Sequence, residues 1–315
     1  MISIIIPIYN EEKNIKNTID NLKSIIFSTF EVLLVNDGST DYTERIIKEI
    51  TKDDNRFNLI NKPNGGVSTA RNLGLQHAKY PYILFLDADD YFHPNILKKL
   101  YENIIEHDAD ISICGHILKT DKGEHLIAKG KKRLLSKEEA FNNMIKTNMY
   151  GGYIFNKLFK ASILKDVSFN TDIRFMEDMV FFLDALKHST TIIYDPTPLI
   201  TYIKNETSVT MSEYSESRLT SIIALQVIID TTASWNINHR SLKRFYLTTI
   251  INLLMFGHKE KKLDTNTTSM LINALKKYQL PSLYIFVVYL VDKHFKFAYF
   301  LWNVAYTLIR PFFNN

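Results

Sequence analysis

The 315-residue chain contains one cysteine, Cys114, so it cannot form an internal disulfide or supply a cysteine-based zinc site. A single cysteine also fits a protein of a reducing compartment. The nine histidines lack metal-binding spacings such as His-Glu-x-x-His. No Gly-x-Gly-x-x-Gly follows the first apolar run, and no Gly-x-x-x-x-Gly-Lys-Ser/Thr is present. These absences disfavour zinc ribbons, dinucleotide oxidoreductases and P-loop nucleotidases.

Long apolar runs are missing as well. The apolar stretch of nine residues at 283–291 is followed by Asp292 and Lys293, and Lys296 interrupts the next stretch. A membrane-spanning helix needs about 20 apolar residues, so neither piece is expected to span a bilayer alone. Near residue 1, a short apolar stretch without a preceding basic region meets Pro7, so we expect no signal peptide.

The composition is otherwise ordinary for a globular protein, with 46% hydrophobic and 23% charged residues. The net charge of +4 hides an asymmetry. Residues 231–315 carry 11 lysines and arginines against 3 acidic residues, whereas residues 1–230 carry a net charge of −4. An acidic front part and a basic, aromatic back part indicate two regions with different partners.

Strand and helix patterns alternate in the front part of the chain. Apolar runs that end in polar turns occupy residues 2–10, 30–41, 57–64 and 82–90. Segments with helical spacing of apolar residues separate them, at intervals of about thirty residues, which predicts βαβ units on a mostly parallel α/β sheet. Ligands of such sheets bind beyond the carboxyl ends of the strands.

The last of these runs ends in the sequence FLDADDY, residues 85–91, where a buried strand meets three carboxylates. Asp87, Asp89 and Asp90 can chelate a hard divalent cation such as Mg²⁺ or Mn²⁺. The alternative is a solvated turn that caps a helix. The cation is favoured because the strand is too apolar to be exposed, and because the other strand ends also carry polar groups.

Farther along the chain, the pattern predicts a helix after residue 136 with a capping box from Ser136 to Glu139. Ser39 or Thr40 is expected to cap an earlier helix that begins near Asp41. Beyond residue 212, long helical patterns replace the strand alternation. We therefore expect a catalytic domain over residues 1–212 and a helical region over residues 213–315.

Five segments resemble the inverting family 2 glycosyltransferases of bacteria, of the kind that builds surface polysaccharide or teichoic acid. They occur in the family's order and spacing, and the resemblance covers roughly residues 1–210. They read SIIIPIYNEEKNI, LLVNDGSTD, NGGVSTARNLGL, LFLDADD and MEDMVFF. The resemblance implies a GT-A fold, which is a mostly parallel sheet flanked by helices, and a nucleotide-sugar donor, most often a UDP-sugar.

The resemblance also assigns the donor side of the site. The donor-binding positions are Pro7, Tyr9, Glu11, Asp37, Asn64, Gly66, Arg71, Asp87, Lys204 and Ser208. Tyr9 is expected to stack on the base, and Asp37 to accept a hydrogen bond from uracil N3–H. The structural alternative for Tyr9 is a core-edge aromatic, and that for Asp37 is an N-cap or an Asx-turn. Arg71 has the alternative of a surface helix arginine. Lys204 stands where relatives carry arginine, so the diphosphate clamp is expected to be looser.

The same resemblance makes Asp89 the direct ligand of Mn²⁺ or Mg²⁺ and Asp178 the general base, with Glu177 beside it. A neighbouring acidic group and partial burial would raise the pKa of Asp178 toward a useful value. The alternative is an acidic first turn that stabilises its own helix. On the acceptor side, Asn156 and Lys157 match the family, whereas Phe155 replaces a tryptophan.

The basic and aromatic segment 283–313 has two interpretations. As an interfacial helix, it would attach a cytoplasmic enzyme to the inner leaflet of the membrane. As a helical subdomain, it would pack on the catalytic domain or on a second subunit in a homo-oligomer. The membrane interpretation suits an acceptor carried on a lipid.

The sequence thus predicts transfer of a sugar from a nucleotide sugar to a glycan or a lipid-linked acceptor, with no nucleic-acid partner. Two other functions remain as rivals. A nucleotidyltransferase that makes nucleotide sugars would need a basic, glycine-rich loop after the first strand, whereas residues 9–15 are acidic there. A non-catalytic nucleotide-sugar-binding partner would bind without turnover.

Overall fold

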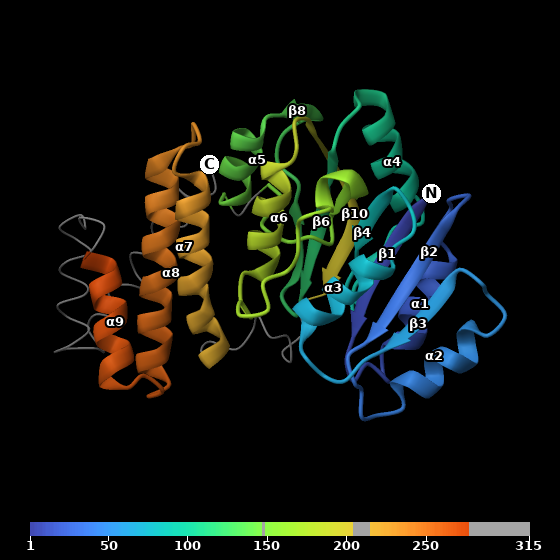
Figure 1. Ribbon diagram of the computed structural model, residues 1–315, viewed down its shortest axis with the longest axis horizontal. Coiled ribbons are helices and arrows are strands. Elements are labelled where there is room, and N and C mark those ends of the chain that lie inside the picture. Colours follow the sequence, from blue (N-terminus) through green and yellow to red (C-terminus); the bar gives the residue numbers. More distant parts are fainter. Residues whose placement is uncertain (147–148, 204–214, 277–315) are drawn as a thin grey trace.

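The computed structural model describes residues 1–146, 149–203 and 215–276 (Figure 1). A large twisted sheet lies at the centre, with helices on both of its faces. Three further helices, which follow the sheet in the sequence, stand beside it. This is the α/β architecture that the alternating sequence pattern predicted.

Among the described residues, ten strands form one sheet, in the order β3-β2-β1-β4-β9-β6-β10-β5, with β7 paired to β6 and β8 paired to β10. The pairs among β1 to β4 and the pair β6–β10 are parallel, and the other pairs are antiparallel. The strands are β1 (Ile2–Ile8), β2 (Phe30–Asn36), β3 (Phe57–Asn61), β4 (Tyr82–Phe85), β5 (Tyr91–Phe92), β6 (Ile111–Thr120), β7 (Gly123–Ile127), β8 (Arg133–Leu135), β9 (Lys157–Lys160) and β10 (Ile192–Ile203).

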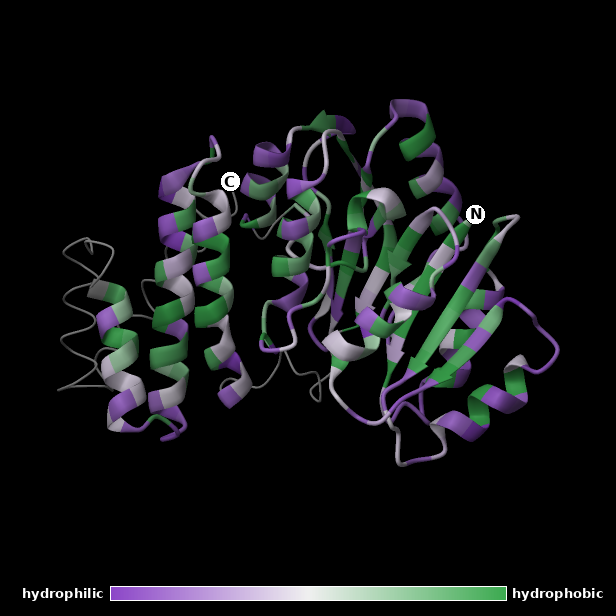
Figure 2. Ribbon diagram, viewed as in Figure 1, coloured by the Kyte–Doolittle hydropathy of each residue, from purple (hydrophilic) through white to green (hydrophobic). Residues whose placement is uncertain are grey.

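The helices cover the sheet in two layers. One apolar core lies between the sheet and α1, α2 and α4, and a second lies between the sheet and α3, α5 and α6. The helices are α1 (Ile15–Lys23), α2 (Thr43–Thr51), α3 (Val67–His77), α4 (Ile96–His107), α5 (Lys137–Met144), α6 (Glu177–Lys187), α7 (Ser221–Thr232), α8 (His239–Lys259) and α9 (Thr265–Lys276). Figure 2 shows the apolar colour concentrated on the central strands, because both faces of the sheet are buried.

The register of the parallel strands places their carboxyl ends side by side. Ile2 of β1 lies opposite both Phe30 of β2 and Tyr82 of β4, so the turns that follow these strands meet at one edge. Gly74 has no side chain, which allows α3 to pack directly on Ile5 of β1. The edge that gathers the predicted site residues is therefore fixed by well-packed elements.

Two predictions about helix ends had different outcomes. The capping box of α5 is confirmed, with Ser136 Oγ accepting from the amide of Glu139 at 3.2 Å. The prediction that Ser39 or Thr40 caps α2 was wrong, because the helix begins only at Thr43, without a side-chain cap. Ser39 Oγ instead accepts from the amide of Asn10 at 3.0 Å, which joins the turns after β1 and β2.

Helices α7, α8 and α9 share an apolar core of their own (Figure 1). Met176, Ile229 and Phe245 connect this core to the one beneath α5 and α6. Just before α6, the amides of Arg174 and Phe175 donate to Thr220 Oγ1 at 3.0 and 3.1 Å. The helical part thus braces the segment that leads into α6.

The expected domain boundary at residue 212 and the segment 283–313 lie outside the described residues. Within the described residues, no helix combines the length and the apolarity that crossing a bilayer would require.

Candidate active site

Arg71, on α3, is the centre of the candidate site. Its guanidinium group lies 3.0 Å from Asp87 Oδ1, 2.6 Å from Asp178 Oδ1 and 3.3 Å from Glu177 Oε1. The arginine side chain is 5% exposed, so the alternative of a surface helix arginine was wrong. One buried cation therefore joins a carboxylate after β4 to two carboxylates that lie some ninety residues farther along the chain.

The two acidic residues of α6 occupy its first turn, as both interpretations of the sequence required. They are also turned toward the sheet edge, because Met176 before them adopts a left-handed conformation with φ of +73°. Burial raises the pKa of Asp178 to about 7, even though the Arg71 charge opposes the shift. Burial raises the pKa of Glu177 as well. Asp178 is thus suited to accept a proton near neutral pH.

The turn after β4 concentrates negative charge. Burial, together with the Asp87 charge, raises the pKa of Asp89 to about 6, and the same two causes raise the pKa of Asp90 to about 9. Asp90 Oδ1 accepts from the amide of Ile203 at 3.1 Å, but its Oδ2 is buried without a partner among the described residues. No lysine or arginine of the described ranges pairs with Asp89. A cation at this turn would relieve the repulsion.

Within the described residues, no three His, Cys, Asp or Glu side chains form a preassembled metal cluster. The donor chemistry nevertheless fits a hard cation, because Asp89 supplies oxygen ligands and has no positively charged partner within the part of the chain that the structure describes. Mg²⁺ is commonly held by one or two carboxylates together with substrate phosphates, and such a site is incomplete before the substrate binds.

Asp37, after β2, organises the turn that follows β3. Its Oδ1 accepts from the amide of Gly65 at 2.9 Å, and its Oδ2 accepts from the amide of Gly66 at 2.7 Å. Lys62 pairs with the same carboxylate, a contact that the sequence did not reveal. Asp37 is 3% exposed. The Asp37 carboxylate thus forms neither an N-cap nor an Asx-turn, but bonds the turn after β3. The uracil contact stays a prediction.

The other donor-side residues line the same edge with differing exposure. Tyr9 is 49% exposed, so its ring is available for stacking, and the alternative of a core-edge aromatic was wrong. Pro7 is half-buried inside β1, and Asn64 Nδ2 donates to the Asp37 carbonyl at 2.9 Å. Burial raises the pKa of Glu11. The negative charge of Glu11 in turn contributes to the raised pKa of Asp89. The predicted positions Lys204 and Ser208 lie outside the described residues.

Asn156 and Lys157 lie beneath the site, not on its surface. Both side chains are fully buried, and their place on the acceptor side stays a prediction. Lys157 Nζ donates to Gly151 O at 3.3 Å and to Asn156 Oδ1 at 2.8 Å, and Asn156 donates to Cys114 O at 3.0 Å. The physical reason is that these polar groups satisfy the backbone of the turn before β9.

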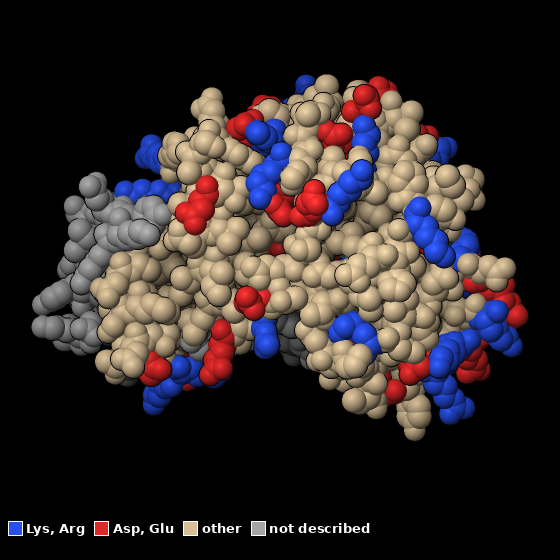
Figure 3. Space-filling model, viewed as in Figure 1, with Lys and Arg blue, Asp and Glu red and all other residues tan. Residues whose placement is uncertain are grey.

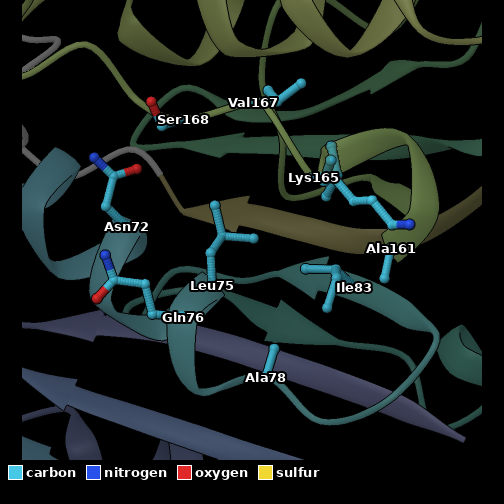
Figure 4. Close-up of a pocket in the computed structure, with 10 residues that line it drawn as sticks. Asn72, Leu75, Gln76, Ala78, Ile83, Ala161, Lys165, Val167 and Ser168 are labelled. Carbon is cyan, nitrogen blue, oxygen red and sulfur yellow. The ribbon is translucent and has the colours of Figure 1, made fainter.

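A separate groove of about 510 Å³ lies between α3 and the short helix at Ala161–Leu164 (Figure 4). Asn72 and Gln76 reach it from α3, and Lys165 reaches it from the other wall. None of the described residues predicted for the site lines this groove, and it contains no carboxylate. The face that carries α5 and α6 shows acidic and basic side chains interspersed, without an extended patch of one sign (Figure 3).

A doubly covered, mostly parallel sheet with an acidic cluster beyond its strand ends defines the GT-A class of fold. The crystal structure of Staphylococcus aureus TarS residues 1–349 with UDP-GlcNAc has this fold and superposes with a TM-score of 0.70. The match covers 98% of this chain and 91% of that one at 21% identity. The mannosyltransferase PcManGT of Pyrobaculum calidifontis, solved with GDP-Man and Mn²⁺, matches 96% of this chain and 86% of its own at 15% identity, with a TM-score of 0.57.

The chain belongs to glycosyl transferase family 2, whose sequence profile matches residues 3–168. It is 31% identical over 220 residues to an uncharacterized glycosyltransferase, EpsJ of Bacillus subtilis, a match that covers 68% of this chain and 64% of EpsJ. It is also 30% identical over 192 residues to the poly(ribitol-phosphate) beta-N-acetylglucosaminyltransferase TarS of Staphylococcus aureus, a match of 58% of this chain and 32% of TarS. The chain thus aligns with less than two thirds of either relative.

Proposed function

We propose that this protein catalyses the inverting, metal-dependent transfer of a sugar from a nucleotide sugar, a UDP-sugar by preference, to a glycan or lipid-linked acceptor. Cell-surface polysaccharide or teichoic acid is the proposed product. Family membership supports the reaction type, and the UDP-GlcNAc held by TarS supports the donor class. The name of TarS supports a polyol-phosphate polymer among the acceptors to be tried.

The observation that carries the proposal is the contact of Arg71 with both catalytic elements. The guanidinium group reaches Asp87 at 3.0 Å and Asp178 at 2.6 Å. A donor that lies against the turn after β4 would therefore present its sugar beside Asp178. A sheet that merely bound a nucleotide would not need a buried carboxylate with a pKa raised to about 7 at that place.

In the proposed reaction, the acceptor hydroxyl forms a bond to the sugar C1 on the face opposite the diphosphate. Asp178 accepts the hydroxyl proton as that bond forms, and the bond from C1 to the diphosphate oxygen breaks. The nucleoside diphosphate leaves with both electrons of that bond, so the configuration at C1 inverts. Arg71 keeps Asp178 oriented toward the edge where the two substrates meet.

Asp89 would hold the divalent cation, with Asp87 supporting the donor ribose or an intervening water. When bound, Mn²⁺ or Mg²⁺ neutralises charge on the leaving diphosphate. The raised pKa of Asp89, about 6, fits a carboxylate that lacks its counter-charge. The Mn²⁺ in the crystal structure of PcManGT supports a cation in this fold.

The reaction class can be tested by product analysis. The full chain is incubated with Mn²⁺ and a panel of UDP-, GDP- and TDP-sugars, with and without polyol-phosphate and lipid-linked acceptors. We expect nucleoside diphosphate to be released. A parallel incubation with nucleoside triphosphates and sugar 1-phosphates tests the rival enzyme. Pyrophosphate released there, without nucleoside diphosphate from the nucleotide sugars, would replace the proposal with a nucleotidyltransferase. Binding without release of either product would favour a non-catalytic partner.

For the rest of the chain, we propose that residues 1–212 are the catalytic domain and that residues 213–315 attach it to the cytoplasmic face of the membrane. The basic and aromatic sequence of 283–313 supports this. Sedimentation with anionic vesicles is expected to fall when the chain is truncated at about residue 280. If vesicle binding does not change, the region packs on protein, as it would in a homo-oligomer.

A further inference from the structure

A group of three aromatic rings lies at the site without a role in the reaction described above. Tyr153 stacks on Phe155 with ring centroids 5.0 Å apart and planes 19° apart. Tyr202 packs against both rings, at 5.6 Å from Tyr153 and 5.5 Å from Phe155. Phe155 is 1% exposed, whereas Tyr153 is 36% exposed. Tyr153 is thus a partly exposed ring that Phe155 and Tyr202 support, with the His116 ring edge-on to it at 5.7 Å.

The turn that carries this ring packs against the helix that carries the proposed base. Burial raises the pKa of Tyr153, and the charges of Asp178 and Asp90 add to that shift. The preceding residue, Gly152, packs on α6 one position after Asp178, because a Cβ atom there would lie 2.7 Å from Met179 Cε. The turn that carries Tyr153 therefore touches the first turn of α6.

The ring also belongs to the half of the sheet away from the donor-side residues that the structure describes. Those residues lie in or after β1, β2, β3 and β4, which form one half of the sheet. The other two predicted donor positions, Lys204 and Ser208, follow β10 and lie outside the described residues. Tyr153 precedes β9, and Tyr202 belongs to β10, both in the other half. An acceptor that reaches Asp178 from this half would pass over Tyr153.

The position of the ring is fixed from below by Lys157. Its ammonium group donates to the carbonyls of Gly151 and Tyr153 and packs over the rings of Tyr150 and Phe182, at 5.1 and 4.6 Å. A buried ammonium group that donates to several acceptors of one turn holds the backbone of that turn in one conformation. A preorganised ring loses little entropy when it contacts a ligand.

We propose that Tyr153 is an acceptor subsite, on which the apolar face of a pyranose ring stacks while one of its hydroxyl groups points to Asp178. The C–H groups on one face of a pyranose are weakly positive and poorly hydrated, which complements the negative face of an aromatic ring. An open-chain polyol presents no comparable flat face. This inference rests on the proposed function, because it names the acceptor class of that same site.

The test is saturation-transfer NMR with methyl glycosides of glucose, galactose, mannose and N-acetylglucosamine, and with ribitol, in the presence of UDP and Mn²⁺. We expect transfer to the ring C–H protons of at least one glycoside with the wild type and with Tyr153→Phe, and none with Tyr153→Ala. Tyr80→Ala, before β4 at the opposite edge, is the aromatic control and should match the wild type.

Transfer to ribitol alone, transfer to no probe, or equal transfer in Tyr153→Ala would overturn the inference. In turnover assays, we expect Tyr153→Ala to raise the acceptor KM about tenfold, which corresponds to about 1.4 kcal/mol, and to leave the donor KM unchanged. If the wild type itself releases no nucleoside diphosphate, the proposed function fails, while the NMR result still decides the subsite.

Discussion

Replacing Arg71 by methionine tests whether the carboxylate cluster depends on one buried cation. The arginine side chain is 5% exposed and contacts three carboxylates at 2.6 to 3.3 Å. Methionine keeps much of the volume but leaves Asp87, Glu177 and Asp178 without their counter-charge. Removing one partner of a buried ion pair costs about 3–5 kcal/mol. We expect Arg71→Met to lower the free energy of unfolding by that amount at about pH 8.

The loss should depend on pH in a defined direction. Arg71 lowers the pKa of Asp178 against the effect of burial, so the variant raises that pKa further. A carboxyl group that is protonated in the folded state no longer needs a cation. The difference between wild type and variant should therefore be largest at about pH 8 and shrink as the pH falls toward about 5.5.

Urea unfolding followed by circular dichroism at both pH values measures this difference. Arg56→Met is the matched control, because Arg56 pairs with Asp54 at 2.7 Å but its side chain is 36% exposed. An exposed pair contributes about 0–1 kcal/mol. If Arg71→Met cost no more than Arg56→Met at the higher pH, or if its cost did not change with pH, the electrostatic account of the cluster would be refuted. Arg71→Gln, which is also uncharged but can donate to the carboxylates, serves if the methionine variant does not fold.

Three further outcomes are expected. The kcat/KM of the wild type should fall about tenfold per pH unit below about pH 7, because burial raises the pKa of Asp178 to about 7 and a base acts only when deprotonated. A flat pH profile from about pH 5 to 8 would contradict the role of Asp178 as the base. Gly38→Ala should cost about 1–3 kcal/mol and raise the donor KM, because φ is +72° and the new Cβ would lie 2.7 Å from Asn64 N. Its control, Gly123→Ala, has a strained φ of +124° but open space, so calorimetry should show lost stability with donor binding kept. Asp89→Asn should abolish the dependence of donor affinity on Mn²⁺; an unchanged dependence in titration calorimetry would place the cation elsewhere.

Much of the front half of the fold was predictable because its signals are local. The runs that became β1, β2 and β4 are apolar on both faces, and only a sheet covered on both sides accepts such strands. The polar turns after them had to meet at one edge once the strands were parallel. The capping box at Ser136 was equally local.

The parts that were not predictable depend on contacts between distant segments. Nothing near Arg71 in the sequence shows that it will be buried against Asp178, because that contact joins residues 107 positions apart. Ser39 is a residue type that favours helix N-caps, but its hydroxyl oxygen accepts a tertiary hydrogen bond from the amide of Asn10 instead. Lys157 had the sequence context of a binding residue, yet its ammonium group binds the backbone beneath the site.

The surroundings of Tyr153 were not predictable from the sequence either. Nothing near it in the sequence shows that its ring will pack against Tyr202 of β10, which is 49 positions away. The sequence predicted the kind of chemistry better than it predicted which side chains face the substrates, because the former depends on residue types and the latter on packing.

The most direct test of the proposed reaction compares donor binding with turnover in Asp178→Asn. The amide keeps the shape and can still accept from Arg71, but it cannot take the acceptor proton. Titration calorimetry with the active nucleotide sugar and Mn²⁺ should give a Kd close to that of the wild type, while kcat for transfer falls by about 10²–10⁴-fold. Turnover close to that of the wild type, with donor binding intact, would contradict the assignment of Asp178 as the base.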